Sequence, residues 1–545
     1  MDIDKCTIVI DFEDLSIEKA EAQIRTLKYH IQKLSAKRNA LLPINRLPAD
    51  VLLDIFALVG KRPEKGTGRS LLDLTCVSHD WRELVLGAPT LWTIITSSNL
   101  VWAEEWLARS GLAPLSIGLL DMEKDFVLAS MSHFQSVLAH IPRMKALHCT
   151  LSEFEEFSLK LSSRLWVEPA FLLTSLKLER WHLPENFFNS VPNVENMSLK
   201  TCQFSWNIDA NYPHLTFLHI CEPVSTVPVR DFVDLLKGIP SLQRLVLAEV
   251  FSLHGDSDTF LPSPTSVSPR LHVLKLNFNE AIDSSLQFLR CALPCFTTDQ
   301  TIISCSSDLA DLEDDRLPHL LSAFSQTVSP KQVATIKYTH PELPNSSATL
   351  YINYQGADSE SDIYRTTLEI GIDEEQSRTL LATLQETLAL GHVKAVKFGI
   401  HANDLDGGRL VEIFGGLPKL QYFDFRAHYP EVFDFLDALK PADDGISPPP
   451  FASLKVLGSI LAEEVDDRLV EVLSKRRHLG YGLDTVVVGD YCIRAWEGGT
   501  LPRLGDLVNH IPEELGPEAL EIERAFFTGA ESVACGFDMI PFEDD

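Results

Sequence analysis

The sequence predicts an α/β protein in which a short all-helical module is preceded by an N-terminal helix and followed by a solenoid of strand–helix repeats with a curved parallel sheet. Three observations predict this class. Residues 15–42 repeat apolar side chains every seven positions, residues 44–92 carry two apolar helical stripes, and an apolar triplet recurs from about residue 112. A chain of 545 residues with 45% hydrophobic and 23% charged residues has the composition of a folded protein.

These patterns divide the chain into seven expected segments. They are an acidic leader (1–14), a heptad helix (15–42), a helical module (43–95), a first repeat array (110–285), a region that fits the repeat poorly (286–392), a second repeat array (393–500) and an acidic C-terminal cap or tail (501–545). A repeat array adds units without starting a new core, so the length alone does not imply several globular domains.

The heptad helix is predicted from two series of side chains. Ile17, Ile24 and Ile31 recur every seven residues. A second series, offset by three positions, recurs in the same way and consists of Ala20, Leu27, Leu34 and Leu41. These are the a and d positions of a coiled-coil seam. Because the seam covers only roughly three and a half heptads, two alternatives stay open: the helix dimerises, or it packs along its own chain.

The first helix of the module is expected to start near Pro48. Proline suits the first turn of a helix because its missing N–H would have no partner there, and Asp50 complements the positive end of the helix dipole. The apolar stripe of this helix consists of Leu52, Ile55, Phe56 and Val59, widened by Val51 and Leu58. This helix therefore has more apolar surface than one neighbour can cover.

A Gly- and Lys/Arg-rich loop at 60–69 separates this helix from a second stripe. The second stripe consists of Leu74, Val77, Trp81 and Leu84. Ser70 followed by Asp73 is close to a capping box, and Ser78 is expected to break the stripe into two short helices. Trp92 ends the segment as a large apolar anchor.

This arrangement resembles the F-box, in the form common in large fungal families. The family pattern begins with Leu-Pro-x-Glu/Asp-Val/Leu-Leu-x-x-Ile-Phe, continues with Leu-Leu-x-Leu-x-x-Val-Ser/Cys-x-x-Trp-Arg-x-Leu and ends with Pro-x-Leu-Trp. The three parts stand here at Leu47–Phe56, Leu71–Leu84 and Pro89–Trp92. The loop GKRPEKGTG is longer than usual, which leaves the angle between the helices open.

The resemblance implies that the module binds the Skp-type adaptor of a cullin–RING ubiquitin ligase. The adaptor-binding residues that it implies are Leu47, Pro48, Val51, Leu52, Ile55 and Phe56, with Leu74, Val77, Trp81 and Leu84 in the small core or in the same interface. A module of this size is marginally stable alone, so its excess apolar surface also favours a partner. The alternative is a helical cap that shields the first repeat.

The repeats are predicted from the triplet apolar-x-x-apolar-x-apolar. Copies that begin at Leu173, Val194 and Leu215 follow one another at intervals of 21 residues. Further copies begin at Leu112, Met144, Leu242, Leu271, Val393, Leu420, Leu454 and Leu483. The spacing resembles the leucine-rich repeat, in which neighbouring units stack because one strand and one helix cannot bury their apolar face alone.

The strands of such an array line a concave wall. The residues between the anchors are candidates for contacts with a substrate protein, or are ordinary solvated residues. They include Lys177, Glu179, Lys200, Gln243, Arg244, Lys275, Asn277, Asp424 and Arg426. Between the arrays, the segments VATIKY, TLYINYQ and TTLEIGI predict strands. Residues 286–392 are therefore either degenerate repeats or a β-rich insertion.

The composition disfavours several classes of function and location. The formal net charge is −30, from 77 acidic and 47 basic side chains, and such a field repels nucleic acids and anionic membranes. We therefore expect no nucleic-acid and no membrane partner. The N-terminal residues do not resemble a signal peptide, and the ten cysteines show no paired spacing. The expected location is the cytoplasm, the nucleus or both.

No motif for catalysis, a metal or a cofactor stands out. The glycine- and lysine-rich loop lacks the order of a phosphate-binding loop. Cys291, Cys295 and Cys305 lack the spacing of a zinc site, and Asp404 and Asp406 lack the final carboxylate of a calcium loop. We expect a protein that is not an enzyme and that holds no metal or cofactor.

The expected function is the substrate-recognition subunit of an SCF-type cullin–RING ubiquitin ligase. The F-box would bind the adaptor, and through it a cullin, while the repeats would bind a protein substrate and thereby raise the effective concentration of its lysines. One alternative is a repeat scaffold whose F-box has an adaptor-bound, non-degradative role. The other is an enzyme with a site in residues 286–392.

Overall fold

The computed structural model forms two compact units, Met1–Pro192 and Asn193–Asp545. It describes residues 17–60, 70–119, 131–151, 166, 168–206, 212–236, 238–251, 271–278, 288, 300–305, 318, 321–322, 324–325, 332–339, 348–355, 365–372, 374–398, 407–425, 431–441, 448–460, 466–488, 500–512 and 517–527. Predictions for the acidic leader, the loop at 61–69, Cys291, Cys295, Asp404, Asp406 and the residues after 527 lie outside this part of the chain.

The first unit begins with helices and continues with parallel strands. Its elements are α1 (Ile17–Ala40), η1 (Pro43–Arg46), α2 (Ala49–Gly60), α3 (Ser70–Leu74), α4 (His79–Leu86), η3 (Pro89–Trp92), β1 (Ile94–Thr96), η4 (Ser97–Trp102), α5 (Ala103–Ser110), β2 (Leu115–Leu119), α7 (Met131–Leu138), η5 (Ile141–Arg143), β3 (Met144–Thr150), β4 (Ser175–Glu179) and α9 (Phe187–Ser190). Strands β1 to β4 pair in chain order and in parallel, with Leu147 of β3 beside Leu176 of β4.

The second unit continues with strands and helices to the end of the described chain. Its elements are β5 (Asn196–Lys200), β6 (Phe217–Cys221), α10 (Val229–Leu236), β7 (Arg244–Ala248), β8 (Val273–Phe278), β9 (Gln300–Cys305), β10 (Gln332–Thr339), β11 (Ala348–Gln355), β12 (Arg365–Ile372), α13 (Glu374–Thr387), η7 (Leu390–His392), β13 (Ala395–Phe398), α14 (Gly407–Phe414), β14 (Tyr422–Phe425), α15 (Glu431–Ala438), β15 (Val456–Ile460), α16 (Asp466–His478), β16 (Thr485–Val488), α18 (Thr500–Gly505) and α19 (Pro517–Phe527).

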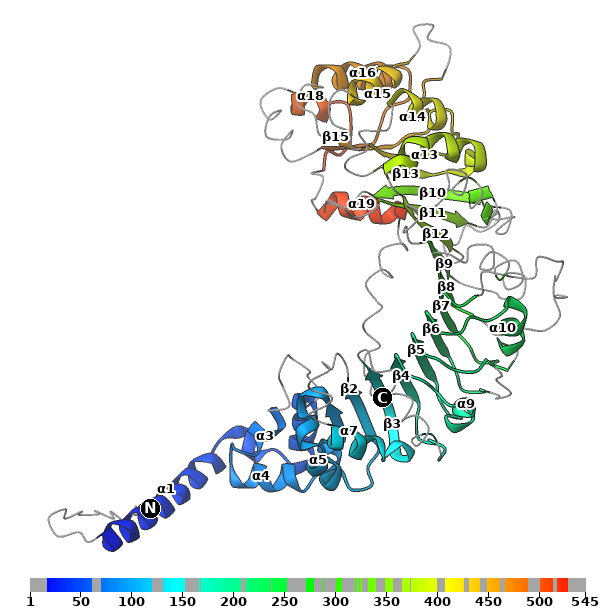
Figure 1. Ribbon diagram of the computed structural model, residues 1–545. Coiled ribbons are helices and arrows are strands. Elements are labelled where there is room, and N and C mark those ends of the chain that lie inside the picture. Colours follow the sequence, from blue (N-terminus) through cyan, green and yellow to red (C-terminus); the bar gives the residue numbers. More distant parts are fainter. Residues whose placement is uncertain are drawn as a thin grey trace. The chain divides into compact units, whose positions relative to one another are not determined.

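The strands of the second unit form one sheet with an antiparallel part in its middle. Strands β5 to β9 are parallel and follow chain order, and so are β13 to β16. Between them lie β12, β11 and β10, which pair antiparallel with one another; β12 runs parallel to β9, and β10 runs parallel to β13. The three strands predicted in residues 286–392 are β10, β11 and β12, and Figure 1 shows them beside β13.

The predicted α/β class is confirmed, and most triplet anchors occupy the positions expected from the pattern. In the three copies at 21-residue intervals, all nine anchors are buried. Leu245 and Leu274 continue the same register on β7 and β8 and are also buried. One anchor is wrong: Leu112 is 94% exposed. It follows Gly111, a left-handed residue in the turn after α5, so its side chain points to solvent.

A backbone feature that the sequence pattern did not predict recurs after four successive strands. Arg180, Thr201, Glu222 and Glu249 each follow a strand directly and have a positive φ between 47° and 63°. The last three still join the ladder, because their N–H groups donate to carbonyl oxygens of Cys221, Ala248 and Asn277 on or beside the next strand. Since a left-handed conformation costs a non-glycine residue roughly 1–2 kcal/mol, its recurrence marks one repeated turn.

The sheet of the second unit is covered on both faces near its C-terminal end. Phe423 of β14 packs against Phe414 of α14 and Phe435 of α15, with ring centroids 6.1 and 5.4 Å apart. The neighbouring Tyr422 faces the other way and belongs to a buried cluster with Ala519 of α19. Helix α19 therefore covers the face opposite α14 and α15, and Figure 1 shows it apart from those helices.

His148 lies on β3 of the first unit, where its side chain is buried. Its Nε2 atom is 3.0 Å from Oγ of Ser175 on β4. Burial, with a smaller effect of the nearby Lys177 charge, lowers the pKa of His148 from 6.5 to about 4. Because a charged imidazole is poorly solvated here, the folded chain holds this residue neutral over most of the mildly acidic range.

We therefore expect the first unit to lose stability as the pH falls. Between 6.5 and about 4 the unfolded chain binds a proton at His148 that the folded chain does not bind. This linkage lowers the free energy of unfolding by about 3 kcal/mol across that window. Urea unfolding of the natural chain and of His148→Gln at pH values across it measures the effect. An equal pH dependence in the two chains would show that the imidazole does not contribute.

Candidate docking surface of the helical module

The helical module has its own small core. Leu52 and Phe56 on α2 and Leu71 on α3 are buried. The ring of Phe56 packs against Trp81 of α4, with centroids 4.8 Å apart. Helix α2 begins at Ala49, and the Pro48 carbonyl accepts the hydrogen bond from Leu52 N–H at 3.1 Å. Pro48 thus precedes the first turn instead of lying within it.

Asn45 joins three elements at one end of this core. Its side-chain oxygen accepts a 2.6 Å hydrogen bond from Trp81 Nε1 of α4. Its Nδ2 atom donates a 2.7 Å hydrogen bond to the carbonyl oxygen of Asn39, near the end of α1. Asn45 therefore fixes both the indole and the C-terminal end of α1. Asn45 does not stand out in the sequence, because nothing in the local pattern predicts a bond to a residue 36 positions away.

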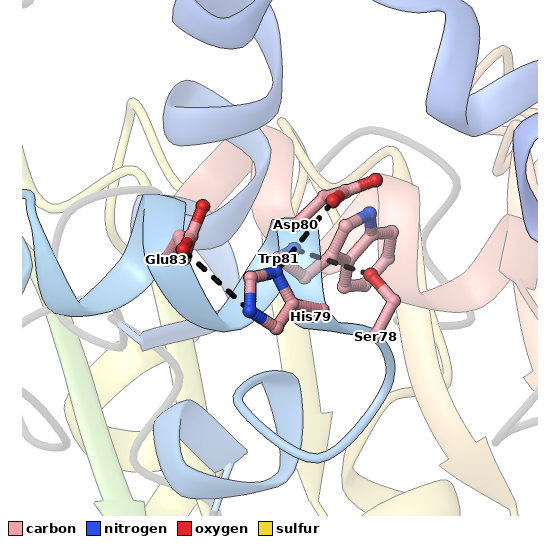
Figure 2. A network of polar contacts seen from close by, with 5 residues as sticks. All are labelled: Ser78, His79, Asp80, Trp81 and Glu83. Carbon is pink, nitrogen blue, oxygen red and sulfur yellow. Dashed lines mark hydrogen bonds and ion pairs between the residues drawn. The ribbon is translucent and has the colours of Figure 1, made fainter. Parts of the chain in front are cut away.

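The predicted break in the second stripe lies at Ser78. Helix α3 ends at Leu74, and α4 starts at His79 with Ser78 as its N-cap. Figure 2 shows the Ser78 hydroxyl accepting a 3.1 Å hydrogen bond from Trp81 N–H. The same view shows His79 beside two carboxylates. Its Nδ1 atom is 3.9 Å from Oδ1 of Asp80, and its Nε2 atom is 3.6 Å from Oε1 of Glu83. Those side chains are exposed, so the contacts contribute little, and the cap is the feature that fixes the helix start.

Helix α2 carries two apolar stripes rather than one. The inner stripe, Leu52 and Phe56, faces the module's core. The outer stripe, Val51, Ile55 and Leu58, follows the spacing i, i+4, i+7 and faces away. Val51 is 39% exposed, Leu58 is 66% exposed and Ile55 is half-buried. The outer stripe is an apolar helix face that no described residue of the chain covers fully.

The ten residues implied by the F-box resemblance differ in how far they are exposed. Leu47, Pro48, Val51 and Val77 are exposed; Ile55, Leu74, Trp81 and Leu84 are half-buried; Leu52 and Phe56 are buried. Leu58 is the most exposed apolar side chain of α2, and it was not among the ten. Its position seven residues after Val51 was the signal that could have found it.

Trp92 connects the module to the first strand. It is buried, its Nε1 donates a 2.9 Å hydrogen bond to the Val85 carbonyl oxygen, and its ring meets Trp106 of α5 edge to face at 4.8 Å. The Arg109 guanidinium lies 5.0 Å from the Trp92 ring centroid. The predicted apolar anchor therefore fixes the module to α5, and the packing of the module does not depend on the outer stripe.

Two other kinds of site find no support among the described residues. In this part of the chain, no group of three or more His, Cys, Asp and Glu side chains is arranged to hold a metal ion. No described helix combines the length and the apolar character needed to cross a bilayer. Comparison with known proteins adds no relative: no protein-family model and no curated protein matches this chain.

Proposed function

We propose that this chain is the substrate-recognition subunit of an SCF-type cullin–RING ubiquitin ligase. The observation that carries the proposal is the outer stripe of α2, which stays accessible although the module's core is already filled by Leu52, Phe56 and Trp81. The outer stripe lies within the Leu-Pro-x-Asp-Val-Leu pattern and its continuation, residues 47–58. A partner that covers it gains roughly 1.5–3 kcal/mol for each large apolar side chain that it buries fully.

In this proposal the adaptor docks on Leu47 and the outer stripe. Leu52 and Phe56 hold α2 in place from within the module instead of touching the adaptor. The Asn45–Trp81 bond and the Ser78 cap have the same supporting role, because they fix α4 against the inner side of α2. An interface of this kind is apolar at its centre and is rimmed by exposed polar residues such as Asp50 and Asp54.

We further propose that the strand-rich part is a leucine-rich-repeat solenoid that binds the substrate protein. Support comes from the buried anchors at 21-residue spacing and from the left-handed residue that follows four successive strands. Among the candidate contacts, Lys200, Gln243 and Arg244 are exposed, and Lys177 and Glu179 are half-buried. Arg244 also lies 5.1 Å from the ring centroid of Phe217 on the neighbouring strand. Lys275 and Asp424 are buried, which makes them poor candidates.

The direct test is reconstitution of the complex. The purified chain and a Skp-type adaptor are expected to co-elute from a size-exclusion column as a stable complex. When the cullin is added, it is expected to join this complex. If the chain and the adaptor elute separately, the proposal is wrong. If the complex forms but no protein accumulates in cells that lack the gene, the result supports the non-degradative scaffold instead.

A further inference from the structure

Helix α1 has an apolar seam that its own chain leaves uncovered. None of its residues, Ile17 to Ala40, is buried in the described structure. Ile17, Ile24, Ile31 and Leu34, which belong to the a and d series, are all exposed. Figure 1 shows α1 extending away from α3 and α4 of the same unit. Of the two alternatives that the heptad pattern leaves open, packing along the described chain is therefore not observed.

A helix of this kind is poorly stable without a partner. Isolated helices in water are marginal, and most helical stability in proteins comes from packing an apolar face. Helix α1 has 24 residues, which corresponds to a length of about 36 Å. Heptads sustained over about three to four repeats are the usual signature of a coiled coil. The seam thus has the length and the pattern that a two-stranded coiled coil requires.

We infer that α1 pairs with α1 of a second copy of this chain, in parallel and in register. The a positions hold Ile17, Ile24 and Ile31, and the d positions hold mostly leucine. β-Branched residues at a with leucine at d favour two parallel strands. Arg38 occupies the next a position, and a polar residue at one a position specifies register at a cost in stability.

The charges beside the seam agree with the parallel arrangement. In a parallel pair, Gln23 faces Lys28 of the second copy and His30 faces Ser35, so no like charges meet at the e and g positions, and one cationic pair, Arg38 with Arg38, forms at the end of the seam. An antiparallel pair centred on the helix sets Lys28 against Lys28 of the second copy. Residues at the e and g positions set the orientation of a coiled coil, and here they disfavour the antiparallel form.

The pairing also determines where the two helical modules lie. Asn45 bonds to the Asn39 carbonyl oxygen and to Trp81, so the C-terminal end of α1 is fixed to its module. A parallel coiled coil then brings both modules to the same end. A dimer presents two outer stripes and two strand-rich regions together, which raises the avidity for any partner with two binding sites. The dimer itself does not depend on the proposed ligase function.

The decisive experiment compares two residues of equal exposure. Ile31 at an a position is 62% exposed and Tyr29 at an outward f position is 61% exposed. The natural full-length chain is expected to show the mass of two 60.9 kDa chains by light scattering at micromolar concentration, and its dimer dissociation constant is measured by sedimentation. Ile31→Glu is expected to raise that constant by about 100-fold or more, because two buried isoleucines are lost, whereas Tyr29→Glu leaves it unchanged.

Orientation is tested by oxidation of a cysteine at the seam. Leu34→Cys is expected to form a disulfide-linked dimer, since parallel d positions face each other closely, and Tyr29→Cys, with the same native cysteines, is not. A natural chain that stays monomeric at all concentrations, or an equal effect of the two glutamate variants, would overturn the dimer. A dimer in which Leu34→Cys does not cross-link would overturn the parallel register.

Discussion

A chain carrying Val51→Asp and Leu58→Asp is expected to bind the Skp-type adaptor about 1000-fold more weakly than the natural chain. Each substitution removes a large apolar side chain from the outer stripe, at roughly 1.5–3 kcal/mol per residue, and adds a charge that the adaptor would have to desolvate. Both side chains are already exposed in the free chain, so the fold of the module is expected to survive. Isothermal titration with purified adaptor measures the loss.

The matched control is Leu112→Asp. Leu112 is an exposed leucine of the same unit that lies outside the helical module, so its replacement adds the same charge without touching the outer stripe. It is expected to leave adaptor binding unchanged. Hydrogen exchange of the α2 and α4 amides checks that the module stays folded. Undiminished binding by the double variant, with the module folded, would exclude the outer stripe as the docking surface.

The contrast between the two stripes changes the interpretation of substitutions at Leu52. The resemblance assigned Leu52 and Phe56 to the adaptor contact, but both lie in the module's core. Leu52→Asp would bury a charge and is expected to unfold the module, so a loss of binding would not locate the interface. Only substitutions at exposed residues of α2 distinguish the loss of an adaptor contact from the unfolding of the module.

The sequence was sufficient for features with a regular period. The spacing of the triplets predicted strands and buried anchors, because alternation and repetition are properties of the chain itself. The break before α4 was predictable for a similar reason, since a serine N-cap acts on residues three positions away. Long-range partners were not predictable. The bond of Asn45 to Trp81 and the cover that α19 provides for β14 depend on segments far apart in the chain.

Helix α2 shows the limit most clearly. The six residues of the apolar stripe predicted for this helix indicate excess apolar surface, but their spacing does not say which side meets the core. The structure places Leu52 and Phe56 inward and Val51 and Leu58 outward. Leu112 was assigned as an anchor for a related reason: a triplet pattern does not show that a preceding glycine turns the chain outward.

Asp424 illustrates how a residue expected on an open strand face becomes part of the interior. It lies on β14 on the same face as Tyr422, which packs with Ala519 of α19, and it is only 2% exposed. Its Oδ2 atom is 3.8 Å from Lys397 Nζ on β13 and accepts a 3.4 Å hydrogen bond from the Tyr422 hydroxyl. Gly458 on β15 makes room, since a Cβ there would lie 2.4 Å from the Asp424 side chain. Asp424 is therefore a structural residue.

We expect Asp424→Ala to destabilise the second unit by about 3–5 kcal/mol, because removing one partner of a buried ion pair leaves Lys397 charged in a poorly solvated site. The matched control is Asp437→Ala. Asp437 also pairs with cations, Lys440 at 3.1 Å and Arg468 at 2.8 Å, but it is 43% exposed, and exposed pairs contribute about 1 kcal/mol or less. Hydrogen exchange of the β13–β15 amides measures the local free energy of opening in each variant. Because both substitutions remove an ion-paired carboxylate, a large difference between them reports mainly the burial of the Asp424 pair. Equal losses would mean that the Asp424 carboxylate is as well solvated as that of Asp437.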